Sequence, residues 1–514
     1  MNLKIFPGYK LHDYLHILGL AGMAVGLVFG KAILSISLLF SLLHLLVLSD
    51  FKSYWKAIVS SRLIQLVALY LIFHFITLIW SDNLSYGLHD IKVRSSLLLI
   101  LLIFVAKKPD KKGVHFILNI FIASVTLATL INFLSYVGLF GYKMYDDIRG
   151  MSLFGSHVRF ALIVVLAIIS THAVNWTFKL KNLIKMILIL WFVFYTYYSQ
   201  VLTGYLTLIV TVCSLGLILL VQNHKRLAIV LSGLTFITFI AATYLLFRPI
   251  PLDKNIDSLP YATKEGNAYY HRPETIQPET GKPAEIMICW KELEREWNKR
   301  SDIPFNNGRD LKNQLVQTTL IRYLASKGLN KDAEGVQALS KQDIENIENG
   351  LASKYTKGFL ARWYSVRYQL LNNANPNEHS LLERLEYWKI GVKIAKFNLL
   401  FGVGIGDIQS EFDKVYVETQ SELKMENRKR THNMFLTTLI TMGIPGLFLF
   451  LWFHMYYFVQ SFRQQYFEGA IIILLLFVSY LTEDTLETQV GVSIAGFFLG
   501  LFNPENKHNE STIS

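Results

Sequence analysis

Charged residues are scarce in this sequence, and their scarcity excludes an ordinary water-soluble protein. Only 17% of the 514 residues are charged, whereas 52% are hydrophobic; a typical globular domain is about a quarter charged. The deficit is uneven, because residues 12–247 and 433–503 are mostly apolar and residues 248–431 have the composition of a soluble protein. We therefore expect an all-α integral membrane protein with one large extramembrane insertion.

Cysteine is almost absent as well. Cys213 lies in an apolar stretch and Cys289 in the polar insertion, so the two would occupy different compartments and an intrachain disulfide is excluded. No cluster of histidine and cysteine has the spacing of a zinc site. We expect neither a metal nor a cofactor.

Acidic residues are few beside basic ones, which gives a formal net charge of +12. The basic residues gather at the ends of apolar segments, a pattern that reports membrane topology rather than nucleic-acid binding. About 20 apolar residues cross a bilayer, and segment 93–106 is the weakest of about twelve candidates. The candidate spans are 12–30, 31–49, 63–80, 93–106, 114–139, 156–175, 184–199, 202–221, 227–247, 433–460, 468–482 and 488–503.

The distribution of lysine and arginine predicts the orientation. With a cytoplasmic N-terminus, the inner segments hold most of the basic residues of the short loops, so both termini are expected inside a bacterial inner membrane. The short outer segments would hold only Lys31, Lys92, Arg94, Lys143 and Arg149. The expected domains are spans one to nine in 1–247, a periplasmic loop domain in 248–431, the last three spans in 432–503 and a cytoplasmic tail in 504–514.

The insertion is expected to be helical. Apolar residues recur at three- and four-residue spacing in 284–300, 311–327 and 381–397. Ser340 and Asp343 resemble a capping box at the start of another helix. We find no strand-like alternation of apolar and polar residues in the insertion.

The end of the insertion carries a notable pattern: His432 and Asn433, nine further residues, then Gly443-Ile444-Pro445-Gly446. A histidine at the water boundary can titrate, and an ordinary pKa near 6.5 lets its neutral ring accept a proton. It could equally be an interfacial histidine without a function. Asn433 could bind a substrate or cap the helix that starts there. Gly443 and Gly446 could break that helix or pack it against a neighbour.

The segment Gly402-Val403-Gly404-Ile405-Gly406 superficially suggests a nucleotide-binding loop. It is not followed by Lys-Ser/Thr and does not follow a strand. A tight turn that returns the insertion to the membrane is the better interpretation, because glycine tolerates positive φ and close backbone approach.

With these residues, the chain resembles the O-antigen ligase and polymerase superfamily, whose signature is His-[Asn/Ser/Gln], nine residues, Gly, two residues and [Gly/Thr/Tyr]. His432, Asn433, Gly443 and Gly446 keep that spacing. Arg384-Leu385-Glu386-Tyr387-Trp388 and the segment 399–406, with Gly402 and Gly404, are similar to the two family segments that precede the histidine.

Other segments refine the resemblance. Residues 328–336 and 482–488 resemble a branch of the family from Bacteroidetes-type bacteria. One departure stands out: many members carry an arginine just before a Thr-Gly pair, where this chain has Leu202. Arg159, at the outer end of the sixth span, is our candidate replacement.

The resemblance implies a metal-independent glycosyltransferase of the hexosyltransferase type. Its donor would be a glycan on a polyprenyl diphosphate, and its acceptor lipid A-core, another glycan or a protein. His432 would be the base, and Arg384 and Arg159 would bind phosphate, because a guanidinium fork matches two phosphate oxygens. Arg94 and Lys92 are weaker candidates for the same contact. Any of these arginines could instead be a solvated or snorkelling side chain.

Three enzyme classes stay open on the sequence: an O-antigen ligase in lipopolysaccharide biosynthesis, a polysaccharide polymerase and a protein O-oligosaccharyltransferase. A transporter is the alternative from another class, and it would need ionisable residues inside several spans. The low polar content of the spans counts against it. Glu483, Asp484 and Glu487, between the last two spans, could orient an arginine, bind a cation or form a solvated turn.

Overall fold

The computed structural model describes residues 9–47, 51–139, 151–223, 258–356, 358–372 and 375–505, with isolated positions between 226 and 244. The chain divides into two compact units. Unit 1 comprises Met1–Tyr145, Arg149–Ile229 and Glu383–Ser514, and unit 2 comprises Asp146–Ile148 and Val230–Leu382. The predicted domain boundaries at 248 and 431 stay predictions.

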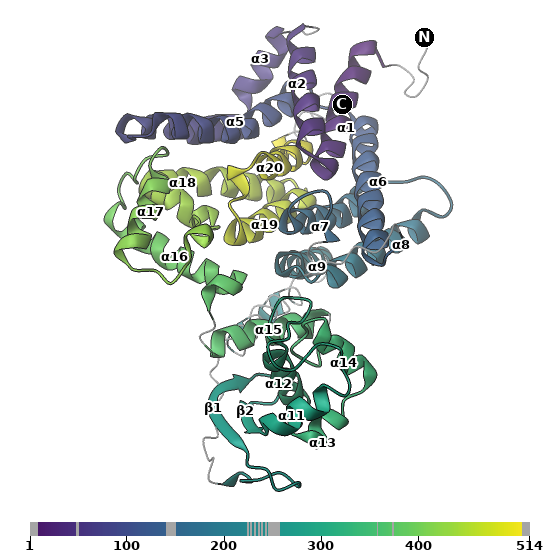
Figure 1. Cartoon of the computed structure of the whole chain (residues 1–514). Coiled ribbons are helices and arrows are strands. Elements are labelled where there is room, and N and C mark those ends of the chain that lie inside the picture. Colours follow the sequence, from purple (N-terminus) through teal and green to yellow (C-terminus); the bar gives the residue numbers. More distant parts are fainter. Residues whose placement is uncertain are drawn as a thin grey trace. The chain divides into compact units, whose positions relative to one another are not determined.

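Unit 1 is a bundle of helices (Figure 1). The helices before unit 2 are α1 (Leu11–Phe29), α2 (Lys31–Val47), α3 (Phe51–Ser60), α4 (Arg62–Thr77), α5 (Leu84–Ala106), α6 (Lys111–Tyr136), α7 (His157–Ala173), α8 (Lys181–Ser199) and α9 (Leu202–Asn223), with the 3-10 turn η1 (Leu78–Trp80). After unit 2 come α16 (Ser380–Phe397), α17 (Ile408–Glu418), α18 (Met434–Arg463), α19 (Phe467–Thr482) and α20 (Gln489–Leu501), with the 3-10 turns η5 (Met425–Asn427) and η6 (Thr485–Glu487).

Five of the described helices are long and apolar enough to cross a membrane: α1, α4 with η1, α6, α8 and α18. The bent pair α2 and α3 makes a sixth if it counts as one span, and α7, α9, α19 and α20 are shorter apolar helices. A multi-pass membrane protein is therefore confirmed, whereas the predicted total of twelve spans stays a prediction. Most residues of the predicted span 227–247 and nearly all of the tail 504–514 lie outside the described residues.

The weakest predicted span, 93–106, is part of a longer helix. Helix α5 begins at Leu84, where the Asn83 side chain accepts a hydrogen bond from the N–H of Tyr86 and caps it. The added turns carry Asp90, which is buried and pairs with Arg94 of the predicted span. The apolar pattern did not include these turns because His89, Asp90 and Lys92 lower their hydropathy.

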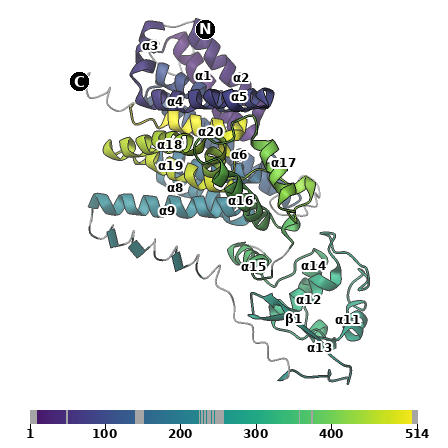
Figure 2. The ribbon, with the colours of Figure 1, turned by 90° about the vertical axis from the view of Figure 1, so that its left-hand side faces the viewer.

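The core of unit 1 brings the last three helices against the earlier ones. Helix α18 packs on α4 and α19, α19 packs on α7 and α9, and α20 packs on α5. Figure 2 shows α9, then α18 with α19, then α20 as successive layers. Small residues allow close packing: a Cβ at Gly500 would lie 2.4 Å from the ring of Phe104. This packing places the turn between α19 and α20 beside the start of α18.

Unit 2 contains α11 (Trp290–Trp297), α12 (Val316–Lys327), α13 (Ala333–Gln337), α14 (Lys341–Glu348) and α15 (Gly358–Leu371), and a 3-10 turn η4 (Pro376–Glu378). Its core is built around Trp297, Leu320, Leu324 and Ile347, which are fully buried. The predicted capping box is confirmed, because Ser340 accepts from the N–H of Asp343 at the start of α14.

The expectation that the insertion holds no strand is wrong. Strands β1 (Tyr270–Gln277) and β2 (Lys282–Ile288) form an antiparallel hairpin, so residues 284–288 are extended and not helical. Pro273 and Pro283 made the segment read as irregular. In a two-stranded sheet every strand has an open edge, so each proline can occupy a position that needs no N–H donor.

Candidate functional site

Helix α18 is broken within the His432 signature. Gly443 has φ of 64° and ψ of −164°, far from helical values. Pro445 has no N–H to donate, and the N–H of Ile444 donates to the carbonyl of Leu399 at 2.8 Å instead of within the helix. The predicted break in the helix is confirmed.

The glycine segment fills this break. The N–H of Val403 donates to the carbonyl of Ile440 at 2.8 Å, and the N–H of Gly404 to that of Thr441 at 3.1 Å. These two carbonyls are the ones that the break deprives of helical donors. A Cβ at Gly402, whose φ is 72°, would come within 2.4 Å of the Thr441 carbonyl. The interpretation of the glycine segment as a tight turn is confirmed. We call the glycine segment 402–406 together with the break at 440–445 the joint.

The start of α18 positions His432. Asn433 is the N-cap, and its Oδ1 accepts from the N–H of Leu436 at 3.1 Å. This is the capping alternative for Asn433, while its contact with a substrate stays a prediction. His432 has φ of 46°, a region that costs a non-glycine residue about 1–3 kcal/mol and is common at functional sites. Its N–H donates to Oδ2 of Asp484 at 3.1 Å, which holds this conformation.

Asp484, between α19 and η6, faces the imidazole of His432. Its Oδ2 lies 3.3 Å from Nδ1, and its Oδ1 accepts from the Thr437 hydroxyl at 3.1 Å. The Nδ1 atom is buried and makes no hydrogen bond to any described residue. Asp484 is the nearer of the two carboxylates beside Nδ1, so it favours a proton on that atom, and this tautomer leaves Nε2 as a proton acceptor.

Glu483 joins His432 to two of the candidate arginines. Its Oε1 lies 3.2 Å from Nη2 of Arg384. Its Oε2 lies 3.9 Å from Nη2 of Arg159 and 3.8 Å from Nδ1 of His432. The Arg384 and Arg159 side chains are each 22% exposed and that of His432 is 27% exposed, so a ligand can reach all three. Residues from α7, α16 and the start of α18 thus meet at one carboxylate.

Glu487 binds a second pair of arginines. Its Oε1 lies 2.7 Å from Nη2 of Arg94, and its Oε2 lies 2.8 Å from Nη2 of Arg430. Arg94 also pairs with Asp90 at 3.0 Å, and its side chain is only 2% exposed. Burial raises the pKa of the Glu487 carboxyl, although Arg430 opposes that effect. The geometry favours a structural role for Arg94, and a direct substrate contact stays a prediction.

Lys92 is the candidate that the structure leaves apart from this cluster. It is exposed on α5, and no ion pair between described residues includes it. Its position two residues from Arg94 directs the two side chains to different sides of the helix. Its contact with a substrate stays a prediction.

Arg430 is the residue that the sequence did not single out. It lies in the run Arg428-Lys429-Arg430 just before the signature, and such runs are usually solvated. Its position two residues before His432 was the available signal. Glu483, Asp484 and Glu487 form an acidic turn between α19 and α20. Of its three interpretations, the structure shows the orientation of arginines, through Glu483 and Glu487.

Tyr387 and Trp388, which follow Arg384 on α16, contact His432 and the residue before it. The Tyr387 ring centroid lies 5.6 Å from that of His432. Trp388 Nε1 donates to the carbonyl of Thr431 at 2.9 Å. Burial raises the pKa of the Tyr387 phenol, so this side chain stays neutral beside the imidazole.

The arrangement can remove a proton from a hydroxyl and hold an anion next to it. The described residues contain no group of three or more histidine, cysteine or acidic side chains that could hold a metal ion. The carboxylates of the acidic turn are instead engaged with guanidinium groups and with His432.

Comparison with known proteins supports this interpretation. Residues 343–451 match the family model described as O-Antigen ligase. The match confirms the resemblance to the O-antigen ligase superfamily, and it covers the signature, Arg384 and the glycine segment. The Bacteroidetes-type branch stays a prediction. No curated protein matches the chain at a significant level.

Proposed function

We propose that this chain, which carries an O-antigen ligase segment at residues 343–451, transfers a glycan from a polyprenyl diphosphate to an acceptor hydroxyl. The family match supports a membrane glycosyltransferase of the ligase or polymerase type. The observation that carries the finer proposal is the convergence of His432, Arg384 and Arg159 on Glu483.

In the proposed reaction, Nε2 of His432 takes the proton of the acceptor hydroxyl. The hydroxyl oxygen attacks the anomeric carbon of the donor glycan. The bond from that carbon to the diphosphate oxygen breaks, and the lipid diphosphate leaves with the electron pair. A general base of this kind contributes roughly 10²–10⁴-fold to the rate. The glycosyl–diphosphate bond itself supplies the energy, so the reaction needs no ATP.

The leaving diphosphate needs cations, and the two arginines supply them. Nε of Arg159 is buried and has no hydrogen-bond partner among the described residues, so it has a donor available for a phosphate oxygen. Arg384 lies on the opposite side of the Glu483 carboxylate. Fixed donors at the site of developing charge are commonly the largest single contribution to catalysis. Charge stabilisation by guanidinium groups makes a metal ion unnecessary in this proposal.

The proposed setting is the periplasmic side of a bacterial inner membrane, with both termini in the cytoplasm. The proposed acceptor is lipid A-core, which makes the protein an O-antigen ligase. A polymerase would use a second lipid-linked glycan as acceptor, and a protein O-oligosaccharyltransferase would use a protein. The residues around His432 serve all three reactions, because each removes a proton from a hydroxyl.

Deletion in the native host, followed by gel electrophoresis of lipopolysaccharide, tests the proposal. Loss of the ladder with accumulation of lipid-linked polymer is expected for a ligase. A single-repeat band indicates a polymerase, and an unchanged ladder with altered glycoproteins indicates a protein transferase. If neither glycoconjugate changes but transport of a solute is lost, the protein is a transporter and the proposal is wrong.

Complementation of that deletion tests the residues. His432→Ala and Arg384→Ala are expected to abolish glycan transfer while the protein still inserts at normal levels. The matched controls are His89→Ala, an exposed histidine on α5, and Lys389→Ala, an exposed cation on α16. Both controls should restore the ladder. A full ladder with His432→Ala contradicts the assignment of His432 as the base.

A further inference from the structure

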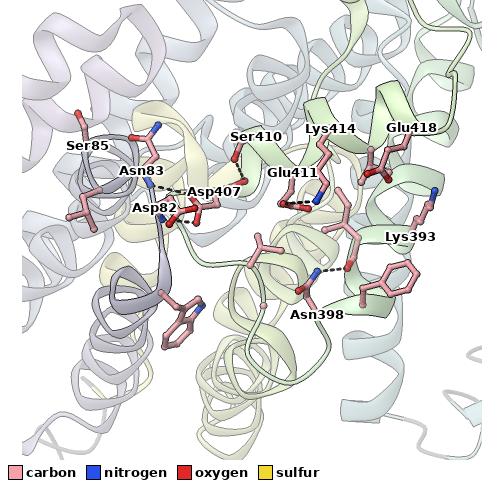
Figure 3. A pocket seen from close by; sticks show the side chains of 17 residues that line it. Asp82, Asn83, Ser85, Lys393, Asn398, Asp407, Ser410, Glu411, Lys414 and Glu418 are labelled. Carbon is pink, nitrogen blue, oxygen red and sulfur yellow. Dashed lines mark hydrogen bonds and ion pairs between the residues drawn. The ribbon is translucent and has the colours of Figure 1, made fainter.

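Unit 1 contains a cavity of about 1050 Å³ that does not include His432. It lies between the start of α5, the end of α16 and α17. Figure 3 shows Asp82 and Asn83 along one side and Lys393 and Glu418 on the other. Gly402 of the glycine segment also lines it, so the joint that shapes α18 shapes this cavity too.

Some of the charges in the cavity are already engaged. Asp407 accepts from the N–H groups of Asp82 and Asn83 at 2.8 and 3.0 Å. Lys414 lies 3.7 Å from Glu411. These contacts fix the wall and cancel part of its charge.

The remaining charged side chains of the lining are Asp82, Glu418 and Lys393. None of the three forms an ion pair within the described part of the chain. Two carboxylates and one ammonium leave the lining acidic, which disfavours a diphosphate or a phosphate headgroup. Carboxylates accept hydrogen bonds from hydroxyls, and an ammonium donates to them. These groups therefore suit a neutral ligand with many hydroxyls.

Aromatic and apolar residues form one border of the cavity. Trp80 and Phe397 line it and are exposed, and the neighbouring Ile79, Leu400 and Phe401 are exposed as well. Tryptophan is common at the membrane–water interface. A sugar ring offers a C–H face that packs on such aromatic rings. The cavity therefore opens where an apolar surface meets a polar one, as suits the sugar of a membrane-anchored glycolipid.

Helix α16 connects this cavity to the candidate active site. Tyr387 lies beside His432, and Ile394, seven residues later on the same helix, lines the cavity. Seven helical residues span about 10 Å. The proposed acceptor is therefore a glycan of a few sugar units, which is long enough to cover that separation.

We infer that this cavity binds the saccharide part of the acceptor, a hydroxyl-rich glycan without phosphate at the bound rings. The inference rests on the proposed glycan transfer, and it assigns the acceptor to α16 and α17 and the donor diphosphate to Arg384 and Arg159. Carboxylate and ammonium groups select the hydroxyl pattern, and Trp80 and Phe397 hold the ring faces.

Saccharide binding to the purified full-length chain in detergent tests the cavity without requiring transfer. The probes are two oligosaccharides from the native host, the core released from lipopolysaccharide by mild acid and the O-antigen repeat unit. Saturation-transfer NMR should show one of them binding. The double variant Asp82→Asn, Glu418→Gln should weaken that binding about tenfold, since a hydrogen bond to a charged group contributes that much or more. Asp413→Asn, an exposed carboxylate on α17 outside the lining, is the matched control.

Phe397→Ala provides a second variant, because its side chain is 81% exposed and its removal leaves no cavity in the core. In a transfer assay, both variants should raise KM for the acceptor about tenfold and leave kcat and the donor KM within about twofold. Binding of the repeat unit instead of the core supports the cavity and identifies the acceptor as a second lipid-linked glycan.

The binding measurement and the transfer assay together distinguish failure of the cavity assignment from failure of the proposed function. If neither probe binds, or if the variants bind as tightly as the wild type, the cavity assignment is overturned even when transfer is normal. A rise in donor KM instead of acceptor KM overturns it too. If saccharide binding depends on the cavity residues but no glycan is transferred, the proposed function fails and the saccharide site stands.

Discussion

Asp484 accepts a hydrogen bond from the backbone N–H of His432 and lies beside its imidazole. Asp484 fixes the left-handed backbone of His432 through Oδ2 and is itself held by the Thr437 hydroxyl through Oδ1. A carboxylate that orients a histidine sets its tautomer and stabilises the imidazolium that forms during proton transfer. Asp484 is therefore a positioning residue in the proposed reaction.

Asp484→Asn is expected to lower kcat for glycan transfer by roughly 10²–10⁴-fold with little change in the donor KM. An amide keeps the shape of the side chain but can present its N–H₂ group to Nδ1, which favours the wrong tautomer. Asp413→Asn on α17 is the control for the substitution type. A kcat within twofold of wild type, or a loss of activity only through a higher donor KM, argues against this role.

At this scale the sequence predicted the residues better than their partners. His432 and Arg384 could be named because their segments resemble those of the family, and Arg159 because of its position at the end of a predicted span. Arg430 could not, because its partner Glu487 lies 57 residues further along the chain, in the turn between α19 and α20, and only the tertiary fold brings them together. The acidic turn was ambiguous for the same reason: nothing local distinguishes a solvated carboxylate from one that binds an arginine.

At the scale of elements, the glycine segment 402–406 and the break in α18 at Gly443 are held together by backbone hydrogen bonds. The break leaves two carbonyls without helical donors, and the N–H groups of Val403 and Gly404 bond to them. The sequence predicted both the break and the turn, since Pro445 and the glycines carry the signal locally. It did not predict that they contact each other, because that pairing is made between distant segments.

Gly443→Ala is expected to destabilise the protein by about 1–3 kcal/mol, the usual cost of a strained backbone. Alanine disfavours φ of 64°, and its Cβ would lie 2.4 Å from the Leu400 carbonyl oxygen. Thermal unfolding in detergent should show a lower Tm. Gly216→Ala on α9 is the matched control, because a Cβ at that position would have no neighbouring atom within 4 Å, and its Tm should be unchanged or slightly higher. Equal melting temperatures for the two variants would falsify the proposed role of the joint.

At the scale of the whole molecule, composition predicted a membrane protein with a folded insertion, and long apolar segments predicted most helices of unit 1. The number of spans was harder to predict. Helix α20 is short and almost wholly buried, and more than half of the residues of α19 are buried, so their apolar residues serve protein packing as well as a bilayer. Hydropathy measures the apolar character of a segment, and it does not distinguish a lipid environment from a protein one.

Orientation is the prediction that belongs to the whole molecule, because all the chemistry proposed for His432 requires the outer side. Lys341→Cys on α14 of unit 2 and Lys56→Cys on α3 place matched, exposed reporters in the two predicted compartments. Replacing Cys213 and Cys289 by alanine removes the native thiols. In intact inner-membrane spheroplasts, a membrane-impermeant maleimide should label Lys341→Cys and leave Lys56→Cys unlabelled until the membrane is permeabilised. The reverse pattern would put the His432 side in the cytoplasm. That result would contradict the orientation predicted from the positive charge at the inner span ends.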